Sequence, residues 1–127
     1  MNLEKVIFGF FVLLAATLNF GFVIGDINDP SVHNPYELLA AIVVNLIATV
    51  LKFGDRTQMG AVHLATSLVA DLQLVAAGVF WVVADQAPGG ISGSAMASVV
   101  SLAAGALLAN IVSVILLIAE TLQFSRR

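Results

Sequence analysis

The stretch MGAVHLATSLVADLQLVAAGVFWVVA, residues 59–84, decides the fold class of this chain. Apart from His63, its only ionisable residue is Asp71. A run of this length meets the requirement of roughly 17–25 predominantly apolar residues for a helix that crosses a bilayer. The same requirement is met by three further runs: 6–24, 36–53 and 95–124.

Composition supports a single membrane domain. Of the 127 residues, 60% are hydrophobic and only 10% are charged, whereas a soluble domain carries about 25% charged residues. The chain therefore has too few charges to cover the surface of a soluble fold. We expect an all-α, polytopic membrane protein: one domain over residues 1–127, with four transmembrane helices arranged as two hairpins in the lipid bilayer.

The basic residues predict the orientation. They lie at the amino end, in the turn between the second and third helices and at the carboxyl end, whereas the connections 25–34 and 85–94 contain none. Basic residues concentrate on the cytoplasmic side of membrane proteins, so we expect both termini in the cytoplasm. The five residues are Lys5, Lys52, Arg56, Arg126 and Arg127.

Helix starts are marked by capping residues. In NPYE, residues 34–37, Asn34 can cap the second helix, with proline at the first helical position and glutamate at the third. In DRTQ, residues 55–58, Asp55 and Gln58 have the spacing of a capping box for the third helix. Ser94, at the end of a glycine-rich connection, is suited to capping the fourth.

A helical projection places small and polar side chains on one face of the third helix, among them His63, Asp71 and Gln73, and leucine and valine on the other. Asp71 lies near mid-depth, where a charged group costs about 2.5–3.5 kcal/mol on insertion scales. It is therefore either protonated or provided with partners. We expect Asn45, Asn110 and Gln73 to orient it, although each amide alone is equally consistent with simple contacts between helices.

A second polar group is expected nearer the cytoplasm, where Glu120 and His63 fall at a similar depth beside Lys52 and Arg56. One interpretation is a rim of ion pairs that anchors the helix ends. The other is a cytoplasmic mouth at which His63 and Glu120 exchange protons or meet ions.

Small residues recur every four positions along the fourth helix, a pattern that lets another backbone approach closely in a membrane. The pattern does not distinguish a partner helix in the same chain from one in a neighbouring subunit. Its members are Ala97, Ser101, Gly105, Ala109 and Ser113.

Several classes of function are disfavoured. The chain has no cysteine, so thiolate metal sites and cysteine nucleophiles are excluded. No metal site or cofactor is expected, because the two histidines are far apart in sequence. No serine has a base and an acid near it, and no basic patch would bind nucleic acid. We therefore expect a protein that is not an enzyme.

The stretches MNLEKVIFGFF (1–11), LNFGFVIGD (18–26), ELLAAIVVNLIATVLKFGDR (37–56) and ATSLVADLQL (65–74) resemble those of a small, uncharacterised four-helix inner-membrane protein family of proteobacteria. The resemblance implies a bacterial inner membrane and a compact four-helix chain. It implies no activity and no functional residues.

Two functions remain open from the sequence. The first is an oligomeric channel or transporter for a cation, either H⁺ or a monovalent metal ion, with Asp71 as its mid-membrane site. The alternative is a non-transporting accessory or assembly subunit of a larger membrane protein complex, in which Asp71 pairs with a group of the partner. A homo-oligomer is expected for the first function, because four short helices enclose little space on their own.

Overall fold

A computed structural model describes residues 3–55 and 57–125 of the chain. The elements in order are α1 (Leu3–Val23), a short 3₁₀-helix η1 (Pro30–Val32), α2 (Pro35–Lys52), α3 (Gln58–Ala84) and α4 (Gly93–Ser125). Each of the four α-helices is long and apolar enough to cross a membrane, as the sequence predicts, and their ends lie within three residues of the predicted bounds.

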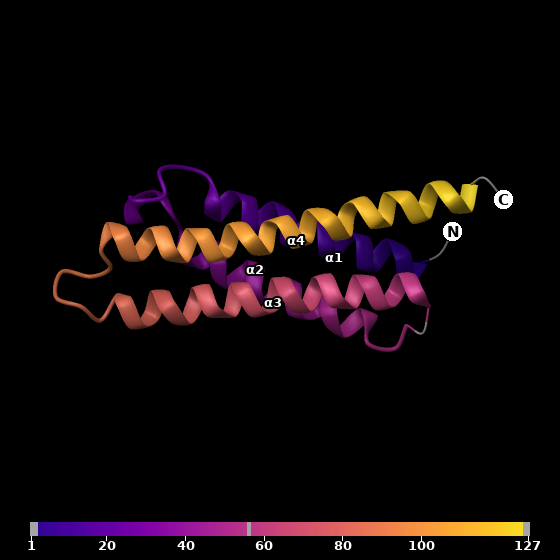
Figure 1. Cartoon of the computed structure of the whole chain (residues 1–127), viewed down its shortest axis with the longest axis horizontal. Coiled ribbons are helices and arrows are strands. Elements are labelled where there is room, and N and C mark those ends of the chain that lie inside the picture. Colours follow the sequence, from indigo (N-terminus) through magenta and orange to yellow (C-terminus); the bar gives the residue numbers. More distant parts are fainter. Residues whose placement is uncertain (1–2, 56, 126–127) are drawn as a thin grey trace.

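The four α-helices form an antiparallel bundle (Figure 1). Around the bundle, α1 packs against α2 and α4, and α3 packs against the same two helices. Residues 3 and 125 lie at one end with the turn 53–57, which we call the terminal end. The connections 24–34 and 85–92 lie at the other, which we call the loop end. Arg56, Arg126 and Arg127, on which the predicted orientation partly depends, fall outside the described residues.

The outer surface of the bundle differs from that of a soluble bundle. Large apolar side chains cover the outside, including Leu72 at 72% exposure and Val82 at 63%. Polar side chains lie inside, and on α3 the buried face is made of small or polar residues with a single leucine, Leu74. This arrangement suits lipid outside and helix–helix contacts inside. The buried polar side chains are Asn19, His33, Asn45, Thr49, His63, Ser67, Asp71, Asn110 and Ser113.

Asn34 caps α2 as predicted: its side chain accepts a hydrogen bond from the backbone N–H of Tyr36, and Pro35 occupies the first helical position. The other two predicted caps are wrong by two residues. The cap of α3 is Thr57, whose hydroxyl accepts from Gly60 N, while Asp55 accepts from Thr57 itself.

The cap of α4 is Ser92, not Ser94. Its hydroxyl accepts from Ala95 N at 3.1 Å, and the helix begins at Gly93. The physical reason is the same in both corrections. A capping side chain must stand directly before the first helical turn to reach its N–H groups, and both helices begin at a different residue from the one that the sequence predicted.

His33 ties the first connection to the bundle. It is buried, with Nδ1 at 2.6 Å from Phe22 O and Nε2 at 2.8 Å from Asp26 O. Both partners are backbone carbonyl oxygens, so the ring joins the last turn of α1 to the connection that follows it. Phe22 O belongs to the last turn of α1, where the helix dipole favours a positive charge.

The small residues of α4 lie at the side of the helix contact, not at its centre. Ser113 is buried, Ala97, Gly105 and Ala109 are half-buried, and Ser101 is exposed. A spacing of four residues turns about 40° per step around a helix of 3.6 residues per turn, so five such positions sweep about 160°. The central stripe is instead Met96, Val99, Val100, Ala103, Ala106 and Asn110.

Candidate functional site

The candidate site is the contact between Asp71 and Thr49 in the interior of the bundle. Asp71 is the central residue of α3, and its side chain is turned inward because it lies on the small-residue face of that helix. Thr49 Oγ1 is 2.5 Å from Asp71 Oδ2 and 2.9 Å from the carbonyl oxygen of Asn45. The other carboxyl oxygen, Asp71 Oδ1, is buried with no hydrogen-bond partner in the described part of the chain.

None of the three amides expected around Asp71 is hydrogen-bonded to its carboxyl group. The side chain of Asn45 donates to Ala41 O in its own helix at 3.2 Å, and it reaches the site only through its backbone carbonyl. The amide of Gln73 lies against Gly105, where an added Cβ would come within 2.7 Å of it. Asn110 is buried on α4 with its Nδ2 lacking a partner among the described residues.

A line of polar side chains runs along α3 from Asp71 toward the terminal end. Ser67 and His63 precede it at intervals of four residues, and all three are buried. Side chains four residues apart on a helix are neighbours, with Cβ atoms about 5–6 Å apart. At the end of this line His63 Nδ1 is 2.9 Å from Ser113 Oγ of α4.

At the terminal end, Glu120 connects three helices. Its Oε2 is 3.0 Å from Lys5 Nζ of α1, and its Oε1 is 3.8 Å from His63 Nε2 of α3. The sequence placed Glu120 and His63 at one depth, and the structure brings them together. It adds Lys5, so the cluster combines the predicted ion-paired rim with a contact to the buried imidazole.

The second basic residue of this end has a different partner. Lys52 Nζ is 3.3 Å from Asp55 Oδ2 and stands 4.3 Å from the ring centre of Phe8. Hydrogen bonds from the side chain and the backbone N–H of Thr57 lower the pKa of Asp55 to about 2. Arg56, which was expected beside Lys52, lies outside the described residues.

These charged groups surround a pocket of about 700 Å³ at the terminal end. Glu4, Lys5, Lys52, Asp55 and Glu120 line it together with Phe8. Phe8 is 2% exposed and stands edge-on to His63, with 5.0 Å between the ring centres. Among residues 3–55 and 57–125, no three histidine, aspartate or glutamate side chains are grouped as metal ligands.

Toward the loop end the interior is almost entirely apolar. On α2, α3 and α4 the buried polar positions stop at the level of the site. Beyond it, the buried polar residues of the described chain are Asn19 of α1 and His33 of the first connection. The apolar cluster that fills this half is Phe22, Leu38, Ala41, Ala70, Leu74, Ala77, Met96, Val99, Val100, Ala103 and Ala106.

Sequence reasoning missed two residues of these sites. Thr49 follows Asn45 by four residues and therefore lies on the same face of α2, which is a signal that could have identified it. No comparable pattern identifies Lys5. Its contact with Glu120 requires α1 to lie beside α4, and hydrophobic patterns alone do not give the order of helices around a bundle.

Comparison with known proteins assigns a family and no activity. Neither the curated proteins nor the solved structures contain a match to the chain. A sequence family does match residues 32–121, from η1 through most of α4. The chain therefore belongs to DUF6394, a family of unknown function.

Proposed function

We propose that this protein moves a monovalent cation across a membrane, most simply the proton, with Asp71 as the mid-membrane site. The observation that carries the proposal is the buried contact of Asp71 with Thr49. An ionisable side chain at the centre of a transmembrane helix is costly and marks a functional site by default. If this side chain only had to join two helices, an amide or a hydroxyl group would do so as well as a carboxylate.

The hydrogen-bond geometry supports a site that gains and loses a proton. Thr49 has one hydroxyl proton, and its oxygen contacts two acceptors, Asn45 O and Asp71 Oδ2. When Asp71 is ionised, the hydroxyl donates to the carboxylate. When Asp71 is protonated, its O–H donates to Thr49 Oγ1 and the hydroxyl turns to Asn45 O. Rotation of a single hydroxyl group therefore accommodates both states.

The number of ligands favours the proton over a metal ion. A permeating metal ion exchanges its hydration shell for several oxygen ligands. Asp71 and Thr49 offer three side-chain oxygens in total, and two of these three are hydrogen-bonded to each other. The unpartnered amide atom of Asn110 is the nitrogen Nδ2, which donates hydrogen bonds and does not bind a cation.

The distribution of polar groups indicates the side from which protons reach Asp71. His63 and Ser67 lead to it from the terminal end, where Glu120 contacts the imidazole. The apolar cluster fills the other half of the bundle. An exchange site reached from one end is typical of a gated pathway and not of an open pore, so opening toward the loop end requires a rearrangement or a second chain.

Location and assembly are part of the proposal. We place the protein in a bacterial inner membrane, on the strength of the family resemblance. We place the terminal end in the cytoplasm, because Lys5 and Lys52 lie at this end and the connections 24–34 and 85–92 carry no lysine or arginine. The exposed Ser101 on the small-residue side of α4 is consistent with a homo-oligomer. Because transport needs no covalent chemistry, we propose that the protein is not an enzyme.

Proton flux into liposomes tests the proposal. Purified protein in vesicles with an internal pH dye should dissipate an imposed pH gradient, and Asp71→Asn should abolish the flux while the fold survives. Asp26→Asn is the control, because Asp26 is an exposed loop carboxylate whose Oδ1 accepts a single backbone N–H. It should transport like the parent.

Two results would contradict the proposal. A folded parent that gives no flux under either polarity of the gradient would favour the accessory-subunit alternative. Equal flux for the parent and Asp71→Asn would remove Asp71 from the pathway.

A further inference from the structure

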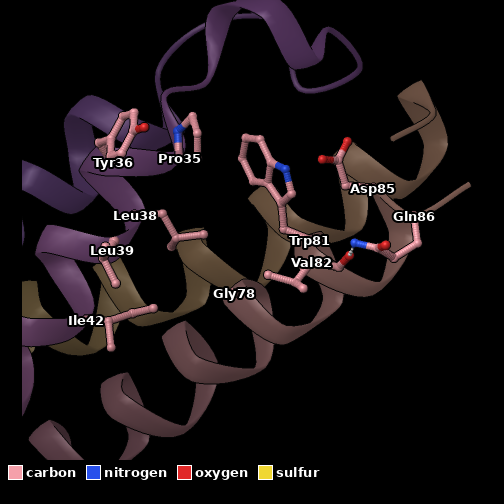
Figure 2. A pocket seen from close by; sticks show the side chains of 10 residues that line it. All are labelled: Pro35, Tyr36, Leu38, Leu39, Ile42, Gly78, Trp81, Val82, Asp85 and Gln86. Carbon is pink, nitrogen blue, oxygen red and sulfur yellow. Dashed lines mark hydrogen bonds between the residues drawn. The ribbon is translucent and has the colours of Figure 1, made fainter. Parts of the chain in front are cut away.

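A pocket of about 490 Å³ lies between α2 and α3 at the loop end, away from Asp71 (Figure 2). Leu38, Leu39 and Ile42 of α2 form one side, and Gly78, Trp81 and Val82 of α3 form the other. The part of the pocket between the two helices is therefore apolar. Its outer limit is polar, because Asp85 and Gln86 follow at the end of α3.

The pocket opens on the outside of the bundle. Leu39 and Val82, which line it, are 57% and 63% exposed. In a bilayer these surfaces meet lipid, and an apolar groove there accommodates an acyl chain. Tyr36 and Trp81 lie in the same lining, and these two residue types concentrate where acyl chains give way to headgroups. Position and composition therefore fit a lipid whose headgroup lies at the level of Trp81 and Asp85.

The polar groups at this level define the headgroup. Asp85 Oδ1 accepts from Ile91 N at 3.1 Å, which leaves Oδ2 for another donor. The indole N–H of Trp81 makes no hydrogen bond to another described residue, and the side chain is only half-buried. Figure 2 shows the indole and the Asp85 carboxylate at the same end of the pocket. An N–H donor beside a carboxylate matches a phosphate followed by an ammonium group.

Charge makes the match selective. The sequence has no lysine or arginine in residues 6–51 or 57–125, and the loop end carries Asp26, Asp29, Glu37 and Asp85. An anionic headgroup without an amine meets repulsion here, whereas an ammonium group meets complementary charge. A primary ammonium also donates hydrogen bonds to a carboxylate, which a quaternary one cannot do.

We propose that this pocket binds one phospholipid with a primary ammonium headgroup, of the phosphatidylethanolamine type. The acyl chain lies along Leu38, Ile42 and Val82, the phosphate accepts from Trp81 Nε1, and the ammonium group donates to Asp85 Oδ2. This site is independent of the transport proposal.

Fluorescence of the single tryptophan tests the site, since Trp81 is the only one in the chain. The full chain is reconstituted in phosphatidylcholine vesicles, and part of the lipid is replaced by lipid with brominated acyl chains, which quench tryptophan on contact. Brominated phosphatidylethanolamine should quench Trp81 with about fivefold higher apparent affinity than brominated phosphatidylcholine or phosphatidylglycerol, the factor given by one partly exposed ion pair of about 1 kcal/mol.

Variants separate headgroup recognition from folding. Asp85→Asn keeps the acceptor for Ile91 N and should lose the preference, whereas Asp85→Glu should keep it. Asp26→Asn, which removes a different loop-end carboxylate, should leave the preference unchanged. Circular dichroism and the tryptophan emission maximum verify that each variant is folded.

Three outcomes would overturn the proposal. Equal quenching by all three lipids would mean that the headgroup is not recognised. Absence of quenching would mean that protein, such as a second copy of the chain, covers the pocket. A preference that survives in Asp85→Asn would remove Asp85 from the site.

Discussion

Replacing Thr49 with valine removes the hydroxyl of the candidate site and keeps the shape of the side chain. The variant leaves both oxygens of Asp71 unpartnered, since Thr49 is the only hydrogen-bond partner of Asp71 in the described chain. A buried polar group that loses its partner costs about 1–3 kcal/mol, and measured contacts between membrane helices reach about 1.7 kcal/mol. We expect Thr49→Val to lower the free energy of unfolding by about 1–2 kcal/mol.

The assay is equilibrium unfolding in mild detergent or bicelles, with two matched controls. Thr49→Ser retains the hydroxyl and should lower the free energy of unfolding by less than Thr49→Val does. Thr17→Val removes an exposed hydroxyl that donates only to Leu14 O of its own helix at 2.9 Å, and it should change stability by less than about 0.5 kcal/mol.

A double-mutant cycle assigns the effect to the pair. In an Asp71→Leu background no carboxyl group remains to lose its partner, so Thr49→Val should cost less there, with a coupling energy of about 1 kcal/mol. The corresponding cycle with Thr17→Val should be additive within about 0.3–0.5 kcal/mol. If Thr49→Val were as stable as the parent, or additive with Asp71→Leu, the hydrogen bond would not hold the site together.

Three further outcomes follow from other parts of the bundle. The lowered pKa of Asp55, about 2 against the usual 3.8, means that its contribution to stability is complete above about pH 4 and is lost as the pH falls toward 2. Thermal unfolding should show this loss in the parent and a smaller one in Asp55→Asn, whereas equal losses would contradict it. His33→Leu leaves the buried carbonyl oxygen of Phe22 unpaired, while Asp26 O keeps its hydrogen bond from Asp29 N. The change should cost about 1–3 kcal/mol, with faster hydrogen exchange in residues 24–34. Unchanged exchange there would show that His33 does not hold this connection. Gly105→Leu must displace the amide of Gln73 and should lower the melting temperature, and an unchanged value would mean that this side of α4 has room for a larger residue.

The parts of the fold that depend on local sequence are predictable. Four apolar runs gave the four helices, because burial of backbone groups in lipid requires helices of that length. Asn34 followed by proline gave the start of α2, and the projection of α3 placed His63 and Asp71 on the buried face. Each of these inferences uses contacts within a single helix.

The arrangement of the site depends on contacts between helices, which could not be predicted from the pattern within each helix. Amides at the depth of Asp71 were expected to be its partners. The partner is Thr49, because the packing of α2 against α3 brings its hydroxyl into contact with the carboxyl group. Glu120 and Lys52 line one pocket, as their similar depth predicts, but Glu120 pairs with Lys5, because α1 lies beside α4 at that level. Thr57 and Ser92 replace the predicted caps because the exact first residue of a helix depends on how each connection folds.

In the proposed pathway, Asp71 is reached from the terminal end and closed from the loop end. The chain has no cysteine, so single cysteines can be labelled without background. Ser113→Cys lies on the polar side of the site, beside His63, and Ala77→Cys lies in the apolar cluster. Gly54→Cys and Ser92→Cys mark the terminal and loop ends in the same membranes.

The decisive measurement is the labelling rate of these variants with a small, membrane-impermeant, cationic thiol reagent added to either side of sealed vesicles. We predict that Ser113→Cys reacts from the side on which Gly54→Cys reacts, and that Ala77→Cys reacts from neither side. Labelling of Ala77→Cys from the side of Ser92→Cys, with Ser113→Cys unreactive, would contradict the account.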